Sequence, residues 1–198
     1  MSVARRLPGN GFFLGERFVL TSIFTLIIDA ITGMLAGMLL LRFWMQAIRV
    51  RPPNSVAQFI FQLTDWLVLP LRRVLPGLGG YDWSSLVGAI LVALLASAID
   101  VALVAGFAPE LILLLALMHI GQWILYGFMG MILISAVFSW VNPQAPLAPF
   151  IASLSDPLLR PLRRIVPMIG NIDLSPLVAL LALQIAMQLL RSLGGALA

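Results

Sequence analysis

The residues best suited to ionic chemistry occur twice in this chain, at the same spacing. Asp65, Arg72, Arg73 and Asp82 return 91 residues later as Asp156, Arg163, Arg164 and Asp173. Guanidinium groups bind phosphate or carboxylate oxygens in bidentate fashion. Each copy therefore predicts either a docking site for an anionic lipid headgroup or a partner, or an anchor whose arginines pair with Asp65 or Asp156. Both interpretations stay open at this stage.

The sequence around these residues is duplicated as well. Positions 57–87 match positions 148–178 at 16 of 31 places, which apolar bias alone does not explain. The other motif residues are Pro70, Pro76 and Gly79 in the first copy, and Pro161, Pro167, Gly170 and Ser175 in the second. Proline removes a backbone donor, so Pro70 and Pro161 should bend a helix and Pro76 and Pro167 should stop it. Glycine suits the reversal. Asp173 and Ser175, followed by proline, predict the capped start of the next helix.

Three more ionisable residues, Asp29, Asp100 and His119, lie in long apolar stretches and are not repeated. Their counterparts in the other copy are Ile120, Arg191 and Ile28. Counted from the ends of the apolar stretches, all three lie in the same half of the membrane and could meet. Ionisable groups inside a membrane are costly and mark functional candidates. The cluster predicts either an ion or proton site or a structural contact between helices.

Motifs for catalysis or cofactor binding are missing from this sequence. There is no phosphate-binding loop of the G-x-x-x-x-G-K type, no dinucleotide glycine fingerprint and no His or carboxylate spacing typical of a metal site. The absence of Cys excludes thiolate chemistry from this chain. Asp65 with Asp82 could be imagined as an acid–base pair, but roles at helix ends explain them more simply. We therefore expect no enzyme activity, no cofactor and no metal.

The composition indicates whether this chain folds in water or in a membrane. Of 198 residues, 61% are hydrophobic and 10% are charged, against about 45–50% and about 25% in soluble domains. Stretches long enough to cross a bilayer occupy 18–41, 85–107, 111–137 and 174–190. These stretches predict an all-α polytopic membrane protein with four transmembrane helices. Residues 1–17 form an N-terminal segment before an uncleaved first span.

Each repeat should place an amphipathic helix between two spans. The first repeat covers 18–107 with its amphipathic segment at 54–75, and the second covers 108–198 with its segment at 145–166. Val56, Phe59, Ile60, Leu63 and Leu67 form an apolar stripe that the second copy keeps. Such a face either lies on the bilayer surface or packs on the helix bundle. Two spans per repeat restore the chain direction, so both copies should face the same way.

Arginine placement predicts the orientation. The two loops that carry the motifs hold eight of the 12 basic residues: Arg42, Arg49, Arg51, Arg72, Arg73, Arg160, Arg163 and Arg164. The positive-inside rule therefore puts both motif loops in the cytoplasm and both termini outside.

The two motif blocks, Leu69-Pro70-Leu71-Arg72-Arg73 through Asp82 and Arg160-Pro161-Leu162-Arg163-Arg164 through Pro176, resemble those of the YggT family of small bacterial membrane proteins, also called YlmG, which has plastid relatives. The resemblance covers nearly the whole chain. It implies the bacterial inner membrane as location. It associates the chain with organisation of division, nucleoid or chloroplast, with assembly of a plastid cytochrome complex, or with osmotic or ion homeostasis. It brings no established active site.

Together these observations predict a non-enzymatic membrane organiser or assembly factor. Its Arg-bearing interfacial helices would contact anionic phospholipid headgroups, and membrane-protein partners or a second copy of the chain are also expected. The alternative is an ion or solute transport component that uses the cluster of Asp29, Asp100 and His119. The net charge of +4 lies beside the spans and is explained by topology, so no direct contact with nucleic acid is expected.

Overall fold

The computed structural model of the chain describes residues 10–75, 79–104, 108–166 and 173–197. These residues form six helices and no strand. The helices are α1 (Asn10–Ala47), α2 (Asn54–Val74), α3 (Trp83–Val104), α4 (Pro109–Val141), α5 (Ala148–Arg163) and α6 (Ser175–Leu197). The predicted all-α class is therefore confirmed.

Four of the helices are long and apolar enough to cross a membrane: Val19–Ala47 within α1, Trp83–Leu103 within α3, Pro109–Val141, which is α4, and Ser175–Leu197, which is α6. Large apolar side chains such as Leu20, Leu26, Leu113 and Leu177 remain more than 60% exposed on them. Helices that are apolar on all sides belong in a hydrocarbon environment. The bilayer therefore supplies the solvent for the outer surface of the bundle.

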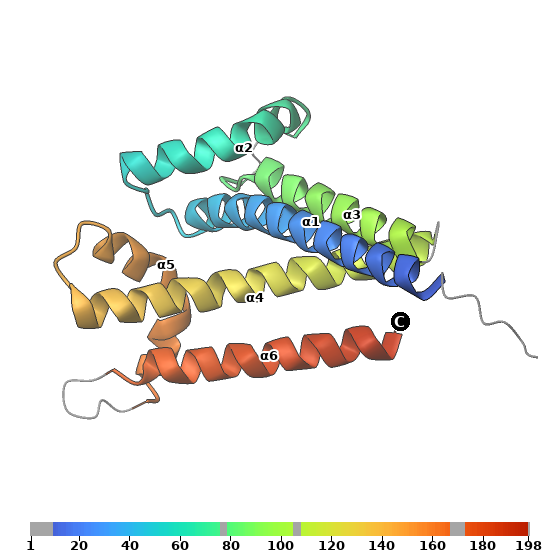
Figure 1. Cartoon of the computed structure of the whole chain (residues 1–198). Coiled ribbons are helices and arrows are strands. Elements are labelled where there is room, and N and C mark those ends of the chain that lie inside the picture. Colours follow the sequence, from blue (N-terminus) through green and yellow to red (C-terminus); the bar gives the residue numbers. More distant parts are fainter. Residues whose placement is uncertain (1–9, 76–78, 105–107, 167–172, 198) are drawn as a thin grey trace, which may run out of the picture.

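The four long helices lie side by side, and the two repeats face the same way (Figure 1). α1 and α4 run in one direction and α3 and α6 return. α1 packs on α3, α4 packs on α6, and α3 and α4 join the two hairpins. α2 and α5 lie at the end where α1 and α4 finish, whereas α1 begins and α6 ends at the opposite end. The motif residues of both repeats therefore share one end of the molecule.

The apolar faces of α2 and α5 pack largely on the bundle. Ile60 of α2, Met45 of α1, and Phe150 and Leu154 of α5 form one buried cluster that joins the two repeats. Two further clusters hold α2 and α5 against their own repeats; they contain Val68 with Ala36, Leu39, Ala89 and Val92, and Leu159 with Ile132 and Ala179. Phe59 stays 49% exposed. The bundle thus covers most of the stripe, and only its margin is left for lipid.

Three prolines lie inside these two helices. α2 continues through Pro70 and α5 through Pro157 and Pro161, so none of them stops its helix. α2 ends at Val74 and α5 at Arg163. Pro76, Pro167 and Gly170 lie outside the described residues. Gly79 and Gly80 have φ of 70° and 81°, a region that glycine enters without the clash a Cβ would cause, so the reversal before α3 needs them as predicted.

Candidate functional site

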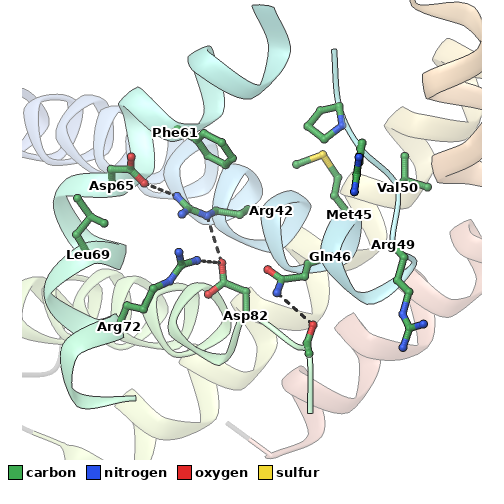
Figure 2. A pocket seen from close by; sticks show the side chains of 13 residues that line it. Arg42, Met45, Gln46, Arg49, Val50, Phe61, Asp65, Leu69, Arg72 and Asp82 are labelled. Atoms are coloured by element: carbon green, nitrogen blue, oxygen red, sulfur yellow. Dashed lines mark hydrogen bonds and ion pairs between the residues drawn. The ribbon is translucent and has the colours of Figure 1, made fainter. Parts of the chain in front are cut away.

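A buried arginine organises the motif of the first repeat. Arg42, near the end of α1, is 7% exposed and donates to Asp65 at 2.6 Å and to Asp82 at 3.2 Å. It also donates to the Thr64 hydroxyl at 2.8 Å, and its guanidinium carbon lies 4.6 Å from the centre of the Phe61 ring. Arg72 reaches the same Asp82 oxygen from the other side at 2.9 Å (Figure 2). One charged network therefore ties α1, α2 and the start of α3 together.

A cavity of about 670 Å³ opens beside this network, between the end of α1, α2 and the turn before α3. Its charged lining residues are Arg42, Arg49, Arg51, Arg72, Asp65 and Asp82. Gln46 donates to the Gly80 carbonyl at 3.1 Å and fixes the turn against α1 (Figure 2). With four guanidinium groups against two carboxylates, the cavity carries a surplus of positive charge.

The second repeat keeps the repeated residues but builds a more exposed network. Arg163 donates to Asp156 at 3.0 Å and to Asp173 at 2.9 Å, and its side chain is 44% exposed. Leu133 occupies the position of Arg42, and Arg160 on α5 itself supplies the second contact to Asp156, at 3.0 Å. The pairing of Asp156 with an arginine is thus confirmed, whereas Asp65 pairs with Arg42, which the repeat does not reveal.

Asp82 and Asp173 also accept hydrogen bonds at the beginnings of α3 and α6. The Asp82 carbonyl accepts the first backbone bonds of α3 and its carboxylate accepts from the Ser85 hydroxyl at 2.8 Å. In α6 the Asp173 carboxylate accepts from the Ser175 amide at 2.9 Å. Burial alone would raise the pKa of Asp173, but hydrogen bonds from the Ser175 amide and from Arg163 outweigh it and hold that pKa below its ordinary value.

The prediction that Ser175 caps α6 is wrong. The Leu174 carbonyl accepts the first helical bonds, so Ser175 already lies inside the helix. Its hydroxyl oxygen is buried and has no hydrogen-bond partner among the described residues. The corresponding Ser84 donates to the Leu75 carbonyl at 3.0 Å, a contact that α6 does not reproduce.

The four arginines predicted to dock lipid fall into two kinds. Arg72 and Arg163 are held by carboxylates. Arg73 and Arg164 are exposed and make no ion pair with any described residue. The second arginine of each pair therefore has no ion pair among the described residues, while Arg72 and Arg163 are ion-paired but remain about half exposed.

Two more exposed arginines, Arg49 and Arg51, follow α1 and likewise make no ion pair within the described ranges. Arg49 has a φ of 57° and occupies the position after α1 where glycine usually ends a helix. The backbone amide of Arg49 donates to the Gln46 carbonyl, and that of Val50 donates to the Met45 carbonyl. An L-residue in this conformation costs on the order of 1 kcal/mol.

The unrepeated ionisable residues come together between three helices. Asp29 of α1, Asp100 of α3 and His119 of α4 place one ligand atom each within 4.8 Å of one another. His119 Nε2 lies 3.9 Å from Asp100, and His119 Nδ1 lies 3.2 Å from the Ser97 hydroxyl. The Trp123 ring stacks on His119 at 5.5 Å. The prediction that these three residues could meet, made from their depth in the apolar stretches, is therefore confirmed.

Comparison with known proteins identifies the family. The family model described as CCB3/YggT matches residues 21–103 and again 114–194. An uncharacterised protein of Pseudomonas aeruginosa is 38% identical over 152 residues, covering 74% of this chain and 77% of that protein. The uncharacterised protein YggT of Escherichia coli is 34% identical over 165 residues, covering 81% and 85%. An uncharacterised protein of Haemophilus influenzae is 35% identical over 159 residues, covering 80% and 86%.

No solved structure matches the chain. The two family segments coincide with the two helical repeats, each of which contributes two candidate spans and one amphipathic helix. The chain is therefore a multi-pass membrane protein that belongs to the CCB3/YggT family, with the family unit present in tandem.

Proposed function

We propose that this protein is a non-enzymatic organiser or assembly factor of the bacterial inner membrane. It docks on anionic phospholipid headgroups, and through them on membrane-associated machinery, by the exposed ends of α2 and α5. The excess of arginine at this end is the basis for proposing that it faces the cytoplasm.

One observation carries the proposal. At the same position of both repeats an arginine with no ion pair among the described residues is followed by an aliphatic side chain that the protein does not cover. These pairs are Arg73 with Val74, which is 77% exposed, and Arg164 with Ile165, which is 80% exposed. An apolar side chain beside a cation is suited to the boundary between headgroups and acyl chains. The ion-paired Arg72 and Arg163 hold each pair in place.

Lipid retention tests the docking. Full-length protein is purified in detergent and its phosphatidylglycerol adducts are measured by native mass spectrometry, with phosphatidylcholine for comparison. Since each arginine near an anionic surface contributes about 1 kcal/mol, the Arg73→Ala/Arg164→Ala variant should bind phosphatidylglycerol about 5-fold more weakly at each of the two positions. Arg17→Ala/Arg191→Ala removes the same charge from the start of α1 and the end of α6, at the opposite end of the bundle, and should retain wild-type binding. Equal loss in both variants would contradict specific docking.

A crosslinking experiment tests the organiser role. A photoreactive residue at Val74 or Ile165 should capture lipid and discrete membrane-protein partners in cells, whereas one at Leu113, on the bundle surface, should capture lipid alone. Indistinguishable capture from all three positions would argue against a role in organisation.

A second candidate function is ion transport, favoured by the meeting of Asp29, Asp100 and His119 between the spans. It predicts flux through wild-type protein in liposomes that falls in Asp29→Asn. Equal flux in the two proteins would remove this candidate.

A further inference from the structure

The cluster of Asp29, Asp100 and His119 lies inside the apolar part of the bundle. Asp100 is one helical turn from the end of α3, about 6 Å along the axis, and His119 is ten residues into α4, about 15 Å. The surrounding helices meet the criteria for membrane spans. These side chains therefore have to satisfy their charges mostly with one another or with a bound ion.

The charges of the three side chains do not balance by themselves. Within the described residues, His119 is the only ion-pair partner of Asp100, and Asp29 makes no ion pair. Two carboxylates thus share one imidazole, and charges left unmatched in a medium of low dielectric cost several kcal/mol. Two carboxylates, a neutral imidazole and one dication together carry no net charge.

The imidazole is oriented as a metal ligand is. Ser97, which is fully buried, contacts His119 Nδ1 at 3.2 Å, so the other ring nitrogen, Nε2, faces Asp100. A hydrogen bond at the non-ligating nitrogen fixes the ring and the tautomer of metal-binding histidines. Trp123 stacks on the same ring, and Gly33 on α1, one turn from Asp29, leaves room for that indole.

The distances between the three side chains suit a cation after small side-chain movements. The ligand atoms lie within 4.8 Å of one another. Ligands that each lie about 2.0–2.2 Å from a tetrahedral zinc ion are separated from one another by less than this, by on the order of 1 Å. Asp29 is exposed and can swing about its own side-chain bonds. Three protein ligands leave a fourth position for water.

We propose that Asp29, Asp100 and His119 form an intramembrane site for one divalent transition-metal cation. A mixed set of imidazole and carboxylates favours zinc or manganese over magnesium, which keeps its waters and prefers oxygen alone. The bound cation joins α1, α3 and α4, the three helices that connect the two repeats. The site does not depend on the docking proposed for α2 and α5, and it requires no transport.

Metal retention tests the site. Full-length protein without a polyhistidine tag is stripped with chelator in detergent, incubated with zinc, manganese or magnesium, desalted and measured by elemental analysis. We expect one zinc per wild-type chain and none in Asp100→Asn or His119→Gln. Glu110→Gln, which removes an acid from the first turn of α4, is the control and should retain one zinc.

Two further readouts separate binding from misfolding. Zinc should change the tryptophan fluorescence of wild-type protein, and Trp123→Phe should lose most of that change while keeping the metal. Ser97→Ala retains all three ligands and should weaken zinc binding 10- to 100-fold, as loss of an outer hydrogen bond does. Zinc should also raise the melting temperature of wild-type protein but not of Asp29→Asn.

Folded wild-type protein that retains neither zinc nor manganese after desalting would overturn the proposal. Equal retention by wild type, Asp100→Asn and His119→Gln would overturn it as well, because the metal would then be bound elsewhere. Neither result bears on the lipid adducts of Arg73 and Arg164, so the two proposals fail independently.

Discussion

At the scale of single residues, the repeated motif separates into an anchoring arginine and an exposed one. Arg72 and Arg163 each reach a carboxylate that starts the next helix, while their neighbours Arg73 and Arg164 point their charge to the surroundings. The sequence predicted that aspartates and arginines could pair but not which arginine does so. Adjacent residues of a helix lie about 100° apart around its axis, so only one of each pair can face the bundle.

Arg42 shows where prediction from repeated residues fails. It is 7% exposed, nearly as buried as Asp82 at 4%, yet it has no counterpart in the second copy, where Leu133 stands. Another feature of the sequence could have identified Arg42, because Arg42 is the only charged residue between positions 30 and 48. A charge in such an apolar stretch requires a partner, and the aspartates of the motif were the nearest acids in the fold.

Removing Arg42 should therefore destabilise the protein more than removing Arg163, the half-exposed arginine that pairs with the two aspartates of the second repeat. Arg42→Met leaves the nearly buried Asp82 with one partner and should cost about 3 kcal/mol, as breaking a buried ion pair does. Arg163→Met in the second repeat acts on a half-exposed pair and should cost less than about 1 kcal/mol. Unfolding in mixed micelles with increasing dodecyl sulfate measures both. Similar losses would show that burial does not set the strength of these networks.

At the scale of helices, length and apolarity were sufficient to predict the four membrane spans, because a stretch of about 20 apolar residues has few other structures available in a bilayer. The spacing of apolar residues predicted the two amphipathic helices between them. The position of the apolar faces of α2 and α5 was not predictable. An amphipathic stripe has the same pattern whether it meets lipid or protein, and the choice depended on Met45 of α1 and Phe150 of α5, which lie far apart in the sequence.

Close packing of α4 and α6 depends on glycines that the apolar pattern does not reveal. A Cβ on Gly121 would lie 2.9 Å from Leu190, and one on Gly194 would lie 3.2 Å from Met118. Gly121→Ile should therefore lower the melting temperature in detergent, because overpacking costs about 1–3 kcal/mol. Gly130 has nothing within 4 Å of an added Cβ, so Gly130→Ile is the matched control. An equal effect of both would point to helix propensity rather than packing.

At the scale of the whole molecule, two repeats facing the same way place both charged networks at one end. The chain contains no cysteine, so a single introduced cysteine reports its side of the membrane without background. With the proposed orientation, Gly195→Cys should react with an impermeant maleimide in spheroplasts, and Gln144→Cys only in inverted vesicles. The reverse pattern would place the arginine-rich end outside and remove the basis for docking on the cytoplasmic leaflet.

The buried position of Arg42 also has a consequence for synthesis of the chain. Its acceptors Asp65 and Asp82 follow it by 23 and 40 residues, which take about 1–5 s and about 2–8 s to add at 5–20 residues per second. The acceptors of Arg163 lie only 7 and 10 residues away. During translation the first half therefore carries an unmatched cation at the membrane boundary for seconds, whereas the second half neutralises its own almost as it emerges. We therefore expect an insertase or a chaperone to act mainly on the nascent first hairpin.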